Sequence, residues 1–411
     1  MYILSLLIFK GDIFWMGTSY SINLRVMGYF TETSGQTGNL KTIYLPGLNG
    51  LRAIAALAVV ISHITLGLGG FGLNNKIFGT DLEGNPSGSA LAGYGVTIFF
   101  TLSGFLITFL LLKEKEKTTK LNVKNFYIRR ILRIWPLYYL YLAVCLITYY
   151  LSDISFATSS VPYYVFITAN IPFIIGGTLP FLAHYWSLGV EEQFYLFFPQ
   201  LAKLSNKRLF NISIGLILLF LLLKFIFWVL DRKYNIHLPY SAIGVTRFHT
   251  MLIGVIGAIF YYDRNHTFLS ISTHKVTQII SWSVILLLTI NKFHIASVID
   301  GELVSVIAVF LIVGQITKRN NLINLENSFC DFIGKISFGI YVIHPILIFG
   351  YSKLLGHFED DLLINYLFIY ALITATTILF SYLSYEFYEK RFLKLKAKYA
   401  TVKSKNTKNS P

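Results

Sequence analysis

The stretch "LPGLNGLRAIAALAVVISHI", residues 45–64, is an apolar helical pattern that carries an arginine near its start and a histidine near its end. It is about as long as a helix must be to cross the apolar part of a membrane. On a helix Arg52 and His63 share one face, separated by about 16 Å along the axis. We predict a membrane-spanning helix with Arg52 at one end and His63 deep inside.

The composition of the whole chain indicates a membrane protein. The 411 residues are 55% hydrophobic and only 13% charged, with a mean hydropathy of +0.60. A soluble domain of this length needs more charge to cover its surface. We therefore predict an all-α integral membrane protein folded as one helical bundle. The candidate apolar segments are 48–67, 91–112, 134–151, 161–176, 188–202, 209–230, 242–262, 276–291, 302–316, 333–355 and 363–387.

The distribution of basic residues constrains the number of crossings. Residues 113–133 contain eight Lys and Arg against two Glu, and eight more basic residues follow Tyr388. Basic stretches beside spanning helices mark the cytoplasmic side, so both should lie inside. If the proline-broken region 161–202 crosses only once, about ten transmembrane helices satisfy this rule. We expect a re-entrant or outer-face segment near 161–187 and both termini in the cytoplasm.

Three parts are expected along the chain. Residues 1–44 form an N-terminal extension of doubtful start, for which Met16 and Met27 are alternative first residues. Residues 45–393 form the membrane domain, and 394–411 form a basic cytoplasmic tail.

The net charge of +15 is concentrated beside predicted spans, so membrane lipids are the expected partners and nucleic acid is not. The only cysteines, Cys145 and Cys330, lie in or beside apolar runs. They predict neither a disulfide framework nor a metal site.

Several polar residues interrupt the apolar segments. His63 is a functional candidate because ionisable groups inside a membrane are costly, although a hydrogen-bonded core histidine is the alternative. Ser103 precedes Gly104, a pair typical of close helix packing. Arg247 and His344 are further polar residues in apolar helices, and a hydrogen-bonded core role is favoured for His344.

Two pairs of charged residues are also candidates. Arg130 and Arg133 share a helical face, where they would bind either phosphates or anionic lipid headgroups. The adjacent Glu191 and Glu192 point about 100° apart on a helix, so they should have different partners. One would orient a histidine or arginine, and a structural salt bridge is the alternative.

Taken in order, six stretches resemble acyltransferase family 3, membrane enzymes that acylate bacterial surface polysaccharides and related acceptors. They are "GLNGLRAIAALAVVISH" (47–63), "GVTIFFTLSGFLIT" (95–108), "RRILRIWPLYY" (129–139), "WSLGVEEQFYL" (186–196), "GKISFGIYVIHPI" (334–346) and "SYEFYEKRF" (384–392). The family usually has an acidic residue where this chain has Thr97, and often a proline where it has Arg391.

The resemblance implies an acyl-CoA-dependent O-acyltransferase of the bacterial plasma membrane. Such an enzyme moves an acyl group, acetyl by default, from cytoplasmic acyl-CoA to a hydroxyl of a cell-surface glycan or lipid-linked glycan, with no permanently bound cofactor. Arg130 and Arg133, together with Ser103, would bind the donor. Arg52 would line the mouth of a thioester channel, and His63 would stand at its end.

The expected mechanism is general-base catalysis by neutral His63, with a covalent acyl-histidine as the alternative. Glu191 would hold the imidazole tautomer, as the carboxylate of a serine-hydrolase triad does. A transporter or exporter of surface glycans is the alternative function, and a purely structural membrane protein is a third.

Overall fold

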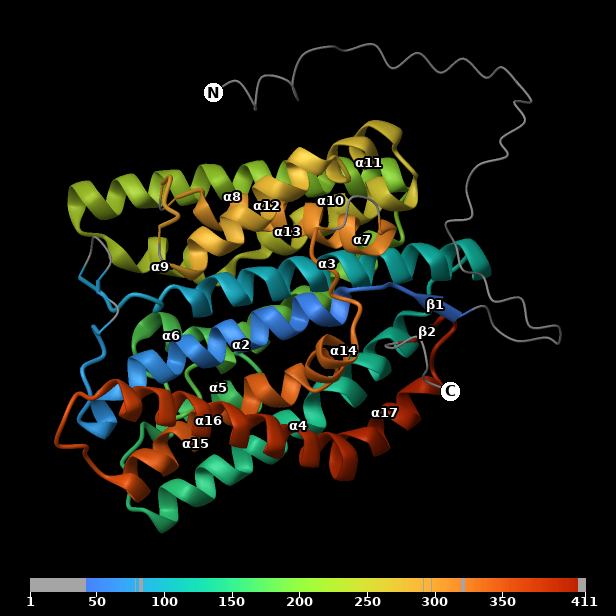
Figure 1. The fold of residues 1–411 in the computed structure, drawn as a ribbon. Coiled ribbons are helices and arrows are strands. Elements are labelled where there is room, and N and C mark those ends of the chain that lie inside the picture. The colour runs from blue at the N-terminus through green and yellow to red at the C-terminus, as the bar shows by residue number, and fades with distance from the viewer. Residues whose placement is uncertain are drawn as a thin grey trace, which may run out of the picture. The chain divides into compact units, whose positions relative to one another are not determined.

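The computed structural model describes residues 42–77, 79–80, 84–290, 292–296, 298–318 and 322–405 (Figure 1). The predicted extension 1–44 lies outside the described residues except for its last three, and so do residues 406–411 of the predicted tail. The described part is predominantly helical, and its only strands are two of three residues each, which confirms the predicted all-α class.

The longer helices are α2 (Leu48–Gly67), α3 (Leu91–Thr118), α4 (Val123–Leu151), α7 (Tyr185–Ala202), α8 (Asn206–Tyr234), α9 (His237–Thr246), α10 (Phe248–Tyr262), α12 (Lys275–Thr289), α13 (Asp300–Thr317), α15 (Ser337–Leu355) and α16 (Leu363–Ser384). The shorter elements are β1 (Thr42–Tyr44), η1 (Leu68–Phe71), η2 (Thr158–Ser160), α5 (Val161–Val165), α6 (Asn170–Ile175), α11 (His266–Ser272), α14 (Ser328–Lys335), η3 (Tyr385–Glu389), α17 (Lys390–Ala397) and β2 (Lys403–Lys405).

Fewer helices than predicted qualify as membrane spans. Within the described residues, eight are long and apolar enough to cross a membrane, or up to nine if α11 and α12, bent by 54°, form one span. Helix α7 is not among them, because Glu191, Glu192 and Gln193 lower its hydropathy. The region before α7 forms the short helices α5 and α6, and its predicted re-entrant path stays a prediction.

Close backbone contact joins α3 to α10, which lie side by side in Figure 1. A Cβ atom at Gly104 would lie 2.0 Å from the carbonyl oxygen of Met251, and one at Gly254 would lie 2.2 Å from that of Thr101. Only glycine permits this approach, and small residues serve the same purpose in many membrane bundles. The packing role predicted for Gly104 is confirmed.

The C-terminal helices return to the first half of the chain. Helix α16 continues through η3, a π-helical turn, into α17, which packs against α4. The hydroxyl of Tyr388 donates to the carbonyl oxygen of Pro136 at 3.2 Å. Strand β2 then pairs in parallel with β1 (Figure 1). This segment therefore lies beside α4, which carries the predicted donor-binding arginines.

Candidate active site

Two histidines far apart in the sequence meet in the bundle. Nδ1 of His63, on α2, lies 2.7 Å from Nε2 of His344, on α15, and the ring centroids are 5.0 Å apart. His344 is fully buried, whereas His63 is partly exposed. His344 is thus the hydrogen-bonded core residue that its sequence favoured, and its partner is the predicted catalytic histidine.

The second hydrogen bond of His344 sets the protons on both rings. Its Nδ1 lies 3.0 Å from the carbonyl oxygen of Ile340, which can only accept, so Nδ1 must carry the proton. In a neutral His344, Nε2 is then an acceptor, and His63 must donate from Nδ1. Neutral His63 is left with a lone pair on Nε2, the nitrogen that a general base requires.

A third histidine borders this pair. His184, directly before α7, lies with its ring centroid 5.5 Å from that of His344, and its buried Nε2 has no hydrogen-bond partner among the described residues. The hydroxyl of Tyr341 donates to the backbone oxygen of His184 at 2.8 Å and anchors the start of α7. The sequence analysis did not select His184, although it begins the stretch "HYWSLGVEEQ".

Glu191 has different partners from those expected. Its carboxylate accepts hydrogen bonds from the hydroxyls of Ser103 and Tyr195, and no bond to His63 is found among the described residues. The structure therefore does not show the predicted Glu191–His63 contact. Glu191 lies about 10 Å further along α7 than His184, so it is at the level of Ser103 rather than of the histidines.

Glu192 points to another helix, as predicted for adjacent carboxylates. One of its oxygens accepts from Nε1 of Trp135, on α4, at 3.1 Å, and the other is buried without a hydrogen-bond partner. The two glutamates thus have separate partners. In the described part of the chain neither is ion-paired, so the alternative of a structural salt bridge is not supported.

Three arginines gather at the other end of α2. Arg52 lies within electrostatic range of Arg130, Arg133 and Glu191. Its guanidinium donates to the side-chain oxygen of Asn49 at 3.3 Å. The Arg130 guanidinium lies over the Tyr195 ring at 5.2 Å, and its Nε is buried without a partner. The structure therefore groups the arginines that the sequence selected, and it places Glu191 among them.

A second buried polar cluster lies between α8, α10 and α13. Nζ of Lys224 is 2.8 Å from a carboxylate oxygen of Glu302, and Nε2 of His249 is 2.7 Å from the same oxygen. Nearby, Arg247 has a positive φ of 41° at the break between α9 and α10 and donates to Thr97 at 3.4 Å. Arg247 and Thr97 were singled out from the sequence. Nothing in the sequence indicated the cluster of Lys224, His249 and Glu302.

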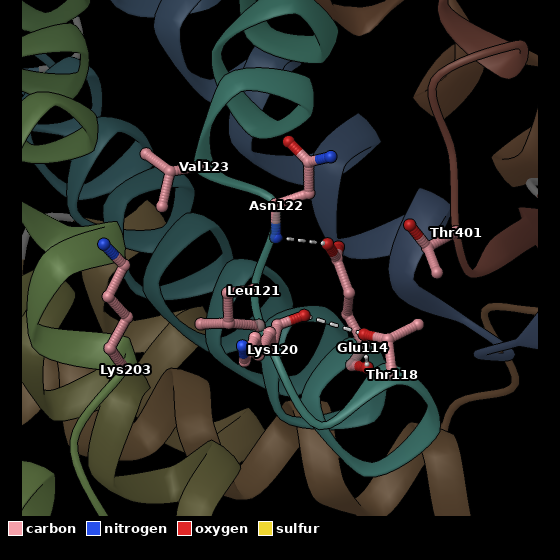
Figure 2. Close-up of a pocket in the computed structure, with 8 residues that line it drawn as sticks. All are labelled: Glu114, Thr118, Lys120, Leu121, Asn122, Val123, Lys203 and Thr401. Carbon is pink, nitrogen blue, oxygen red and sulfur yellow. Dashed lines mark hydrogen bonds between the residues drawn. The ribbon is translucent and has the colours of Figure 1, made fainter.

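A surface pocket of about 480 Å³ opens beside the turn between α3 and α4 (Figure 2). Figure 2 shows Glu114 accepting from the backbone N–H of Asn122, a contact of 3.2 Å. The other oxygen of Glu114 accepts from Arg129 at 2.9 Å. None of the predicted site residues lines this pocket. Its lining residues are Glu114, Thr118, Lys120, Leu121, Asn122, Val123, Lys203 and Thr401.

Together, the fold and these clusters define a polytopic membrane protein. Histidines gather around one end of α2, and arginines gather around the other end. The chain belongs to the acyltransferase 3 family, whose model, described as an acyltransferase domain, matches residues 45–386. The six stretches quoted from the sequence lie within or overlap this range, so the resemblance is confirmed.

Similar proteins come from Staphylococcus aureus. A protein of strain COL named as a candidate O-acetyltransferase is 30% identical over 397 residues, covering 88% of this chain and 59% of its own length. The O-acetyltransferase OatA of strain NCTC 8325 is 35% identical over 167 residues, or 38% of this chain and 24% of its own. The chain thus spans about three fifths of the first relative. No solved structure matches it.

Proposed function

We propose that this protein is a membrane O-acyltransferase that moves an acyl group, acetyl by default, from cytoplasmic acyl-CoA to a hydroxyl of a cell-surface glycan or glycolipid. The observation that carries the proposal is the hydrogen-bond chain from His63 through His344 to the carbonyl of Ile340. It leaves Nε2 of a partly exposed histidine free to accept a proton. Membership of the acyltransferase 3 family supports the reaction class.

In the proposed reaction, Nε2 of His63 takes the proton of the acceptor hydroxyl as that oxygen attacks the thioester carbonyl. The new C–O bond forms, the C–S bond breaks, and the thiolate of coenzyme A leaves. The proton then passes from His63 to the thiolate or to water. A positioned general base contributes typically about 10²–10⁴ in rate. His344 would be a positioning residue, since its Nε2 accepts from the imidazolium that forms on His63.

The donor would enter at the arginine end of α2. Arg52, Arg130 and Arg133 would bind its phosphates, because arginine forms charge-assisted bidentate hydrogen bonds to such groups. The thioester arm would then follow α2 towards His63, over the rise of about 16 Å between Arg52 and His63. Ser103 and Glu191 would lie along this path, where they stabilise its polar wall.

We also propose that the protein crosses a bacterial plasma membrane ten times, with both termini in the cytoplasm. Ten crossings result if the bent pair α11–α12 and helix α7 each cross, in addition to the eight qualifying helices. With an even number, the basic segments 113–133 and 390–405 lie on the same side, as positive charge beside spanning helices requires.

The test measures release of free coenzyme A thiol from acetyl-CoA by the purified protein in lipid nanodiscs. Wild type, His63→Ala and the exposed control His266→Ala are compared with a panel of bacterial glycan acceptors. We expect acceptor-dependent release by wild type and His266→Ala, and none by His63→Ala. Undiminished release by His63→Ala would refute the base. Glycan transport across the membrane without thiol release would favour an exporter over an acyltransferase.

A further inference from the structure

A fourth cation joins the three arginines. Lys396, on α17, lies within electrostatic range of Arg52, Arg130 and Arg133. It is partly buried, whereas Lys394 and Lys398 on the same helix are exposed. The side chain of Lys396 therefore belongs to the face of α17 that is turned towards the arginines.

The C-terminal segment is fixed to α4 on both sides of Lys396. Before it, the hydroxyl of Tyr388 donates to the carbonyl oxygen of Pro136 at 3.2 Å. After it, Nη1 of Arg129 donates to the carbonyl oxygen of Tyr399 at 2.8 Å. The π-turn η3 directly precedes α17, and such turns occur frequently at functional sites because they change which face a helix presents. Lys396 is thus positioned by packing and hydrogen bonds.

The carboxylates beside this cluster offset its positive charge only in part, because Glu191 and Glu389, both within electrostatic range of Arg133, are two against four cations. Glu191 accepts from the hydroxyls of Ser103 and Tyr195, and Glu389 accepts from the hydroxyl of Ser384 at 3.2 Å. Among the residues that the structure describes, no ion pair involves any of the four cations. Burying a positive charge that has no counter-ion is costly. The excess positive charge of this cluster therefore favours the binding of an anionic ligand.

We propose that Lys396 is the fourth cation of a binding site for a ligand with several phosphate groups, and that α17 forms one wall of this site. The ligand is the phosphate-bearing end of acyl-CoA, so this inference rests on the proposed function. A diphosphate and a 3′-phosphate on one molecule match four cations gathered at one place. A phospholipid headgroup offers the same phosphate chemistry, but most such headgroups carry a single phosphate.

The experiment measures binding of coenzyme A to the full-length protein in nanodiscs of phosphatidylcholine, by isothermal titration calorimetry. Lys396→Gln removes the charge, Lys396→Arg keeps it, and Lys394→Gln removes an exposed charge from the same helix. A charge-assisted contact predicts a dissociation constant about 10-fold higher for Lys396→Gln. Lys396→Arg and Lys394→Gln should stay within about 2-fold of wild type, as expected for a retained charge and for an exposed one.

Each result decides a separate question. Equal affinities of wild type and Lys396→Gln would overturn the role of Lys396 while leaving acyl transfer intact, because thiol release tests that reaction independently. If coenzyme A does not bind, but phosphatidylglycerol stabilises wild type and not Lys396→Gln against heat, the ligand is a lipid headgroup and the proposal is wrong. Absence of both coenzyme A binding and thiol release would overturn the proposed function as well.

Discussion

Replacing His344 by leucine tests the histidine pair most directly. His344 is fully buried, accepts from Nδ1 of His63 at 2.7 Å and donates to the carbonyl oxygen of Ile340 at 3.0 Å. Leucine fills a similar space but makes neither bond. His63 then loses the partner that fixes its proton on Nδ1 and that stabilises its charged form during proton transfer. We therefore expect the chemical step to slow while donor binding is unchanged.

The size of the effect follows from the bond that is lost. A hydrogen bond to a charged group contributes about 1.5–3 kcal/mol. At about 1.4 kcal/mol for each factor of ten, kcat should fall about 10- to 150-fold, with KM for acetyl-CoA unchanged. Loss of the side-chain hydrogen bond to the Ile340 carbonyl also costs about 0.5–1.5 kcal/mol in stability, so the melting temperature should also fall.

The assay is the initial rate of thiol release at saturating acetyl-CoA and acceptor. His344→Gln serves as the matched control, because its amide oxygen can accept from His63 and should keep more activity than leucine. His344 acts only through His63, so the double variant His63→Ala/His344→Leu should be no slower than His63→Ala. Independent, multiplying losses in the double variant, or full activity of a folded His344→Leu protein, would refute the reasoning.

The other predictions concern the donor site, the helix packing and the second polar cluster. Arg130→Gln should raise KM for acetyl-CoA about 10-fold through the loss of a charge-assisted contact, and an unchanged KM from initial-rate kinetics would contradict this. Gly104→Ala should prevent α3 from packing on α10, whereas Gly215→Ala, whose Cβ meets nothing within 4 Å, should not; size-exclusion chromatography of the two proteins compares them. Lys224→Met should destabilise the protein by about 3–5 kcal/mol, because it leaves the buried Glu302 carboxylate without its lysine partner. Adding Glu302→Gln removes that charge and should restore part of the lost stability, as measured by thermal unfolding.

The sequence predicted the features that depend on one helix. Hydropathy identified the spans, and the spacing of Arg52 and His63 placed them on one face of α2. Adjacent glutamates were expected to diverge, and they bind different helices. Such inferences succeed because helix geometry relates neighbouring residues directly.

Contacts between helices that are far apart in the sequence could not be predicted from the geometry of single helices. His344 stands 281 residues after His63, and nothing in either segment indicates that α15 packs beside α2. Glu191 was predicted to hold His63 by analogy with the carboxylate of a serine-hydrolase triad. Whether the two side chains can meet depends on the height at which α7 passes α2, which the sequence does not give. Fewer spans qualify by hydropathy than were predicted, because the carboxylates of α7 make that helix too polar to qualify, and the predicted ten crossings stay a prediction.

The levels of the polar residues on α2 and α7 explain why Glu191 has hydroxyl partners near the arginines and shows no contact with His63. Along α2, the order is Arg52 and then His63. Along α7 it is reversed, because His184 lies beside His344 and Glu191 lies within electrostatic range of Arg52. Glu191, about 10 Å along α7 from His184, therefore lies with its partner Ser103 towards the arginine end of α2. A carboxylate there, bound to two hydroxyls, holds the helices together along the route that a thioester arm would follow, and this leaves the choice of the His63 tautomer to His344.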